Sequence, residues 1–425
     1  MDAQQQTRSC DRKRAEVQKT TPRGSQQICI PMTQKQYLAI WDDAAMVREY
    51  LDPLMADYPE IFPASVADGY QLHGRLTESK KLPGVRLRQL RTADGVFTLR
   101  PSFAFPYMTG TIDELEKPLL LLAVHTPIWV VTAVCGRNDM YWERLLERLG
   151  RNSLVGTTVR VPERMPQHLA ADEHHLDWRG DKGFLAMVAA SGCTLGAALT
   201  QAADEKHLLE AYGVFDQEAR NVDPNWQPET INTDGWKATR GAFAKLFRQV
   251  VLVLCFLHGF LKIRDRSRQQ HDLHQRVWEV YRAETASDFQ SRMAELKSWS
   301  DTADLREPVR ENLEKLFAHE TDYATSYDHQ GCYRTSNQVD RPMNRIRRSL
   351  YASRGLHGHQ KTSERRLRGL CLLDNFRPFA PRSNCPREHH SPANRLNGRC
   401  YHDNWLHNLQ TSASLLGFHH RTNRT

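Results

Sequence analysis

The sequence lacks the features of a secreted or membrane-spanning chain. Residues 1–31 are polar and hold no apolar stretch of the kind found in a signal peptide. The apolar run at residues 250–257 is far shorter than the roughly 20 residues that a helix needs to cross a bilayer. A longer run, residues 118–135, is interrupted by His125-Thr126-Pro127, which favours a buried helix. We therefore expect no membrane span.

Cysteine is also used sparingly and without a framework. The nine cysteines are an odd number and are scattered through 425 residues. Disulfide-stapled domains are short and have regular cysteine spacing, which this chain does not have. We therefore expect reduced thiols and a cytoplasmic location.

Positive charge is concentrated in the last fifth of the chain. Residues 341–425 contain sixteen Lys and Arg against four Asp and Glu, whereas the whole chain has a net charge of +8. Eight of the 19 histidines also fall there. Such a block is typical of a partner for a polyanion, most often nucleic acid. The alternative, a solvated basic surface, stays open.

The pattern along the chain divides it into five segments. They are a disordered basic N-terminus (1–31), a mainly helical DNA-binding region (32–165), an α/β catalytic core (166–260), a helical insertion (261–330), and a return of the core with a basic C-terminal tail (331–425).

A helix-turn-helix is one interpretation of residues 127–151. The turn at Cys135-Gly136-Arg137-Asn138 has a glycine suited to unusual dihedrals. Arg144 and Arg148 on the second helix would then enter a DNA major groove. Ordinary helical packing explains the same pattern equally well.

Residues 166–260 predict an α/β core with a mixed five-stranded sheet. The expected helices are 204–220 and 236–247, and the expected strands are 169–172, 183–190, 192–199, 228–233 and 250–255. The last strand is apolar on both faces, as in a covered central strand. This order, with acids ending the first and fourth strands, is the ribonuclease-H-like arrangement.

Acids at two strand ends predict a metal site for phosphodiester chemistry. Asp172 and Asp234 would gather at one sheet edge and supply the hard oxygen ligands that Mg²⁺ prefers. Two such ions can activate the attacking oxygen and stabilise the leaving one. A third acid must come from a later helix, and the candidates are Glu279, Glu284 and Asp340.

Several pieces of the chain, taken in order, resemble the Mutator-like DDE/DDD transposases of bacterial insertion sequences. The pieces are Ala171-Asp172-Glu173, Cys193-Thr194-Leu195-Gly196, Asn232-Thr233-Asp234-Gly235-Trp236, Cys255-x2-His258, Thr335-Ser336-Asn337-Gln338-Val339-Asp340-Arg341, Ser391-Pro392-Ala393 and Tyr401-His402-Asp403-Asn404-Trp405-Leu406. The resemblance covers about residues 35–415. It implies a ribonuclease-H-like fold, and it favours Asp340 as the third member of the triad with Asp172 and Asp234.

The resemblance also implies an activity and its partners. A transposase of this class cleaves DNA at the ends of its element and transfers the 3′-hydroxyl ends to target DNA. It uses two Mg²⁺ ions, with Mn²⁺ as a substitute. The expected partners are double-stranded DNA, as terminal inverted repeats and as target, and further copies of the chain. The expected location is the bacterial cytoplasm, on the nucleoid. Phosphate contacts are expected from Arg341, Arg345, Arg347 and Arg348.

One departure from the family pattern sustains a rival interpretation. Pro342 stands two residues after Asp340, where the family has an apolar helix residue, and an interior proline costs about 3 kcal/mol. A catalytically impaired, transposase-derived DNA-binding protein is therefore an alternative, and so is a ribonuclease-H-like nuclease or resolvase that only hydrolyses.

For three further groups of residues, an ordinary structural role is the alternative to a functional one. Cys255 and His258 are half of a zinc site by composition, but no second pair of matching spacing completes it, so they are markers of the fold. In Asp172-Glu173-His174-His175, neighbours on a strand point to opposite faces, so only alternate members can share a site. Trp178 and Trp236 could stack on bases, although core packing is the commoner fate of tryptophan.

Overall fold

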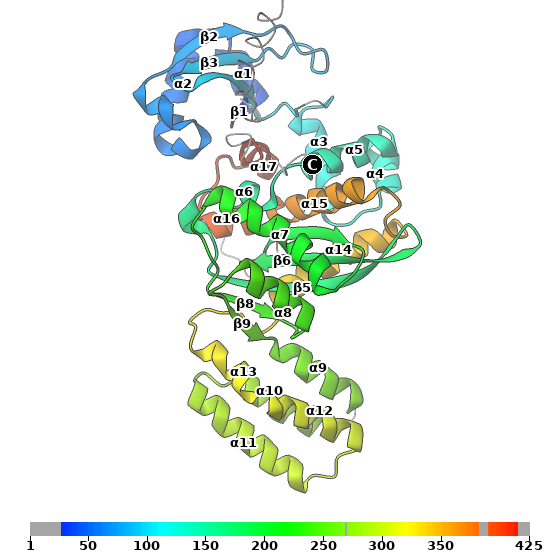
Figure 1. The fold of residues 1–425 in the computed structure, drawn as a ribbon. Helices are drawn as coiled ribbons and strands as arrows, with labels where there is room; N and C mark the ends of the chain where they lie inside the picture. The colour runs from blue at the N-terminus through cyan, green and yellow to red at the C-terminus, as the bar shows by residue number, and fades with distance from the viewer. Residues whose placement is uncertain (1–26, 107, 268–269, 382–389, 415–425) are drawn as a thin grey trace, which may run out of the picture.

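The computed structural model describes residues 27–106, 108–267, 270–381 and 390–414, and Figure 1 shows their arrangement. Three bodies follow one another along its length: a small N-terminal α/β body, a central body built on a five-stranded sheet, and a helical body at the opposite end from the first (Figure 1). No helix within the described ranges is long and apolar enough to span a membrane.

The N-terminal body is a four-stranded sheet with helices on it, in the strand order β1-β4-β3-β2. Its elements are β1 (Gln27–Ile30), α1 (Gln34–Ile40), α2 (Ala44–Asp57), β2 (Gln71–Arg75), β3 (Arg88–Thr92) and β4 (Gly95–Pro101). The expected disorder of residues 1–31 is therefore wrong for 27–30, and residues 1–26 lie outside the described residues. The mainly helical prediction for 32–165 is wrong for β2, β3 and β4, which pair antiparallel with their neighbours in sequence. Strand β1 then adds to β4 in parallel, about 70 residues from its partner.

The central sheet confirms the predicted mixed α/β class. Its order is β7-β6-β5-β8-β9, with β5, β8 and β9 parallel and with β6 antiparallel to both β5 and β7. The strands are β5 (His168–Trp178), β6 (Asp181–Ala190), β7 (Cys193–Thr200), β8 (Thr230–Thr233) and β9 (Val251–Leu254).

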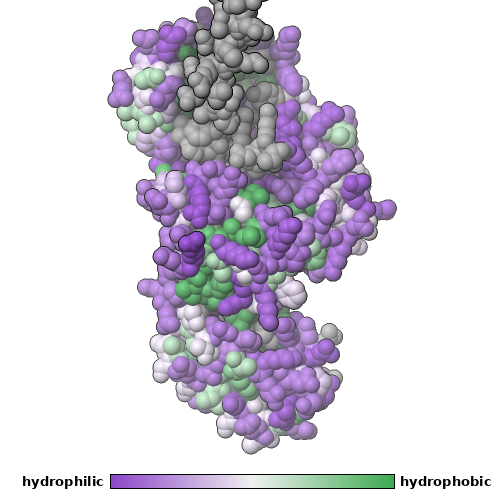
Figure 2. Space-filling model, in the orientation of Figure 1, coloured by the Kyte–Doolittle hydropathy of each residue, from purple (hydrophilic) through white to green (hydrophobic). Residues whose placement is uncertain are grey.

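Helices cover both faces of this sheet and bury its apolar strands. One face carries α7 (Glu205–Val222) and α8 (Lys237–Leu246), and the other carries α14 (Asn337–Ala352) and α15 (Gln360–Phe376). On α14 the buried residues recur at helical spacing: Val339, Pro342, Met343, Ile346 and Leu350. Figure 2 shows a largely hydrophilic surface, with hydrophobic residues gathered over the middle of the visible face.

The helices around α15 form the remainder of the central body. They are α3 (Ile112–Ala123), α4 (Ile128–Cys135), α5 (Asp139–Leu149), α6 (Leu154–Thr158), α16 (Pro392–Asn397) and α17 (Trp405–Ser412). Helix α17 also reaches the N-terminal body, where the Ser414 hydroxyl accepts a 3.0 Å hydrogen bond from the Cys29 amide.

The segment predicted as a helical insertion is helical and has a core of its own. It comprises α9 (Phe256–Arg266), α10 (His271–Tyr281), α11 (Ala286–Thr302), α12 (Glu307–Ala318) and α13 (Glu320–Ala324). Figure 1 shows this helical body projecting beyond β9, the edge strand of the central sheet, which leads directly into α9.

Within the described residues, the predicted basic C-terminal tail is folded as far as residue 414. Helix α15 is buried from Leu367 to Phe376, and the Arg368 side chain is 1% exposed and paired with Glu218. Composition alone shows the charge but not the buried carboxylate that neutralises it. The net charge of residues 341–425 therefore overstates the free positive surface.

Candidate functional site

The parallel strands β5, β8 and β9 bring the predicted acids together at one edge. The last paired residues of β5 and β8 are Ala170 and Asn232. Continuing that register by two positions places Asp172 beside Asp234, and neighbouring strands lie about 4.8 Å apart. The two side chains are close enough that the charge of Asp234 raises the pKa of Asp172. The structure therefore pairs the two acids that the sequence singled out.

Asp172 does not end its strand, contrary to the prediction. Strand β5 runs six residues further, to Trp178, and stays paired with β6 from Ala170 to Trp178. Its parallel neighbour β8 stops at Thr233. Asp172 therefore lies where one neighbour ends and the other continues, which leaves one side of β5 open toward Asp234.

Alternation along β5 sends adjacent acids to opposite faces. Ala170, Leu176 and Trp178 belong to the core beneath α14, so Asp172 faces α14 as well. Glu173 faces α7 and α8, where its carboxylate accepts hydrogen bonds from the Tyr212 hydroxyl at 2.5 Å and the Thr239 hydroxyl at 2.8 Å. Sequence reasoning assigned no role to Glu173. The available signal was the alternation of side chains along a strand, which places Glu173 on the opposite face of the sheet from Asp172.

Burial and neighbouring groups shift the pKa values of Asp172 and His258. Burial raises the pKa of Asp172 to about 7, and the neighbouring Asp234 and Glu173 add to this, while His258 acts in the opposite direction. The pKa of His258 is raised to about 9 by its hydrogen bond with Cys255 and by the charges of Asp172 and Asp234, although burial lowers it. An imidazolium thus stands against two partly desolvated carboxyl groups.

Cys255 connects the end of β9 to the segment that leads to the third acid. Cys255 is the residue before α9, and its buried thiol accepts a 3.1 Å hydrogen bond from the Ser336 amide. The next amide, that of Phe256, donates to the Arg334 carbonyl at 3.1 Å. A packing and positioning role for Cys255 agrees with its interpretation as a marker of the fold.

Asp340 lies in the first turn of α14. Its carboxylate accepts a 2.6 Å hydrogen bond from the Ser336 hydroxyl. Within the described ranges, no group of three or more His, Cys, Asp and Glu side chains is placed to hold a metal ion. The other two candidates belong to the helical body, where Glu279 accepts from Gln275 and Glu284 is exposed.

Pro342 is inside α14, which begins at Asn337. Its ring is buried in the interface with the sheet, and it cannot donate to the carbonyl of Gln338. The Gln338 side chain meanwhile accepts from the Gly192 amide at 3.0 Å, which anchors the first turn. The helix therefore accommodates the proline and keeps Asp340 ahead of it.

The arginines expected to contact DNA have different surroundings. Arg341, Arg347 and Arg348 are exposed on α14. Arg347 is close enough to His174 to lower its pKa, after the larger effect of burial. Arg345 is instead engaged by the buried Asp374, to which it donates at 2.8 and 2.5 Å. Arg345 therefore serves the fold.

The two helices of the expected helix-turn-helix exist as α4 and α5, and Gly136 adopts φ 73 at the turn. Helix α5 buries its apolar side, which includes Trp142 and Leu146, and it crosses α15 closely. Arg144 is exposed, whereas Arg148 is half-buried. The packing of α5 against α15 therefore accounts for the helix–turn–helix pattern of residues 127–151 without any contact with DNA.

The two tryptophans singled out in the sequence have different surroundings. Trp178 is buried and its indole N–H donates to the Gly358 carbonyl at 3.0 Å, which confirms a core role. Trp236 is 54% exposed directly after the Asp234 turn, and its indole donates to the Ala203 carbonyl at 3.1 Å.

Neither a scan against protein-family models nor a search of curated proteins finds a match for this chain.

Proposed function

We propose that the chain is a transposase that cleaves DNA at the ends of its element and joins the 3′-hydroxyl ends to target DNA. The observation that carries this proposal is the parallel register that sets Asp172 beside Asp234. The sheet order β7-β6-β5-β8-β9, with only β5, β8 and β9 parallel, is the one expected of a ribonuclease-H-like core. Both features support the class that the sequence motifs resemble.

The donor set fits Mg²⁺, with Mn²⁺ as a substitute. Asp172 and Asp234 offer hard oxygen ligands, which are the ones that magnesium prefers. Burial and the neighbouring acids raise the pKa of Asp172 to about 7, and a bound cation would favour its ionised form. Two bound ions would activate the attacking oxygen and stabilise the leaving oxygen of the scissile phosphodiester.

Residues of this chain would do the remaining work. His258 places a positive charge beside the two carboxyl groups, and the Cys255–Ser336 hydrogen bond ties β9 to the start of α14. Asp340 would serve as the third acid once its hydrogen bond to Ser336 is exchanged. Arg341 and Arg347 would contact phosphates of double-stranded DNA and set its register on the protein. Further copies of the chain would assemble on the paired ends, in the cytoplasm of a bacterium.

A second candidate is a transposase-derived DNA-binding protein without activity. The Ser336–Asp340 hydrogen bond favours it, because it already engages the carboxylate that would complete the triad. The two candidates differ only in metal-dependent cleavage.

The test uses DNA fragments that flank the gene and carry any short inverted repeats. The proposal expects cleavage by the wild-type chain in Mg²⁺, joining of pre-cleaved ends to a target plasmid, and no cleavage by Asp234→Asn although DNA binding persists. Full cleavage by Asp234→Asn would sink the assignment. Binding without cleavage by the wild type selects the inactive protein, and cleavage without joining selects a nuclease or resolvase.

A further inference from the structure

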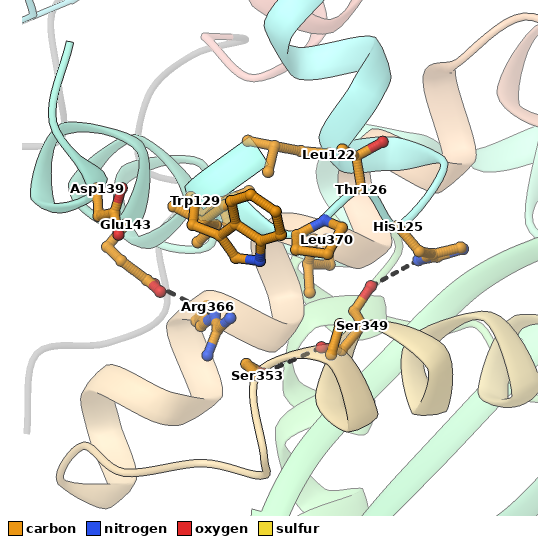
Figure 3. A pocket seen from close by; sticks show the side chains of 14 residues that line it. Leu122, His125, Thr126, Trp129, Asp139, Glu143, Ser349, Ser353, Arg366 and Leu370 are labelled. Atoms are coloured by element: carbon orange, nitrogen blue, oxygen red, sulfur yellow. Dashed lines mark hydrogen bonds and ion pairs between the residues drawn. The ribbon is translucent and has the colours of Figure 1, made fainter. Parts of the chain in front are cut away.

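A second concave site lies away from the acidic pair, at the corner where α3, α4, α5, α14 and α15 meet. It is a cavity of about 210 Å³. Its walls include Trp129, Glu143, Arg366, His125 and Ser349 (Figure 3). Cavities that take drug-sized ligands measure roughly 300–1,000 Å³. The space here suits a single flat ring system.

An aromatic side chain stands open at this cavity. Trp129 is 66% exposed, although a tryptophan is normally well buried. Figure 3 shows its indole between the Glu143–Arg366 pair on one side and His125 with Ser349 on the other. An exposed indole beside a small cavity offers a flat apolar face for stacking, and polar groups lie around it.

Those polar groups present both donors and acceptors. Arg366 and Glu143 form an ion pair at 3.2 Å. His125 Nδ1 is hydrogen-bonded to the Ser349 hydroxyl at 2.6 Å, while its buried Nε2 has no hydrogen-bond partner among the described residues. His125 adopts φ 71, a left-handed conformation that is rare outside glycine. The loop is thus held in a strained conformation, and the ring nitrogen without a partner is buried rather than open to the cavity.

Positive charge adjoins the cavity. Ser349, Ala352 and Ser353 line it from the last turns of α14, the helix whose outer surface carries Arg347 and Arg348. Arg348 is near enough to His125 to act on its pKa. Helix α14 therefore presents guanidinium groups on its outer surface and, about one turn later, one wall of the cavity. A nucleic-acid strand could place a phosphate against the guanidinium groups and the adjoining base in the cavity.

We infer that this cavity binds an unpaired nucleobase of a DNA strand whose phosphates contact the outer surface of α14. The ring would stack on Trp129, and its polar edge would meet the Glu143–Arg366 pair. Stacking of one base on an aromatic side chain contributes about 1–3 kcal/mol. The inference rests on the proposed DNA binding and deepens it, because it names an unpaired base as part of the substrate.

The test measures binding of the full chain to two fluorescent DNA probes. One is a single-stranded 20-mer with a central 2-aminopurine, and the other is the fully paired duplex of the same sequence. The variants are Trp129→Ala, which removes the stacking surface, and Ala352→Leu, which narrows the cavity from an exposed helix position. Val134→Ala is the matched control, because Val134 is on the same helix as Trp129, is 71% exposed and does not line the cavity.

We expect both variants to weaken binding of the single-stranded probe by about five- to 150-fold, the range that stacking of one base implies. Binding of the duplex by these variants and binding of both probes by Val134→Ala should match the wild type. Unchanged single-strand binding by Trp129→Ala, with duplex binding intact, overturns the inference and leaves the proposed function standing. Loss of duplex binding by Trp129→Ala also overturns it.

Two further outcomes separate the explanations. If the wild-type chain binds neither probe, the proposed function fails together with the inference. If Trp129→Ala and Val134→Ala both change the mass measured by light scattering while probe binding is unaffected, the exposed apolar residues of α4 contact another protein chain, and the base pocket is refuted.

Discussion

The buried pair of Arg368 with Glu218 offers the sharpest test of the folded C-terminal region. Replacing Arg368 by Met keeps most of the side-chain volume and removes the charge. The Arg368 and Glu218 side chains are only 1% and 5% exposed, so solvent cannot replace the lost partner. Removal of one partner from a buried ion pair costs about 3–5 kcal/mol.

The other hydrogen bonds of Arg368 and Glu218 decide where in the range of about 3–5 kcal/mol the loss of stability should fall. Arg368 also donates to the Gly150 and Asn152 carbonyls at 3.3 and 3.1 Å, so the substitution removes two further hydrogen bonds. Glu218 keeps hydrogen bonds from Ser153 and Leu154 at 2.9 and 2.7 Å, which partly solvate its charge. The two effects oppose each other, and we expect a loss of about 4 kcal/mol in the free energy of unfolding.

Urea denaturation followed by circular dichroism measures this loss. The matched control is Lys245→Met, since Lys245 pairs with Glu205 at 2.5 Å with both side chains substantially exposed, and such a pair contributes about 0–1 kcal/mol. Adding Glu218→Gln to Arg368→Met should recover part of the loss, because the amide oxygen can still accept from Leu154. A loss below about 1 kcal/mol for Arg368→Met would refute the reasoning.

Two more predictions concern stability. Gly369→Ala should lower the unfolding free energy by about 1–3 kcal/mol in the same urea assay, because its new Cβ would lie 2.2 Å from the Leu146 carbonyl oxygen. Gly213→Ala, which meets nothing within 4 Å in α7, should instead gain up to about 1 kcal/mol; equal effects of the two changes would contradict the close crossing of α5 and α15. Burial lowers the pKa of His407 from 6.5 to about 3, so the unfolded chain binds the extra proton and stability should fall as the pH drops from about 6.5 toward 3. Thermal melts of His407→Gln should show a weaker decline over that range, and an identical decline would show that other groups cause it.

The sequence was sufficient for the central sheet because its signals are local. Residues 183–190 and 192–199 are apolar runs with a glycine turn between them, and they form β6 and β7 within two residues of the predicted limits. The pairing of Asp172 with Asp234 followed from strand order, because parallel strands end at one edge. The full length of β5 did not follow, since only its pairing with β6 extends it past Asp172.

What was missed depends on partners distant in sequence. Strand β1 has four residues and is defined by β4, and Arg345 is withdrawn from the surface by Asp374, 29 residues away. Glu173 has its role through Tyr212 and Thr239, on two different helices. None of these contacts leaves a periodic signal in the chain, so composition and spacing could not reveal them.

The central claim is that Asp172 and Asp234 hold divalent metal, and it can be tested without knowing the DNA sequence. The most direct measurement is titration of the full chain with Mn²⁺, with free Mn²⁺ followed by electron paramagnetic resonance. We predict binding by the wild type, at least tenfold weaker binding by Asp172→Asn and Asp234→Asn, and wild-type binding by Asp301→Asn, whose side chain is exposed on α11. Undiminished Mn²⁺ binding by both Asp172→Asn and Asp234→Asn would contradict the account.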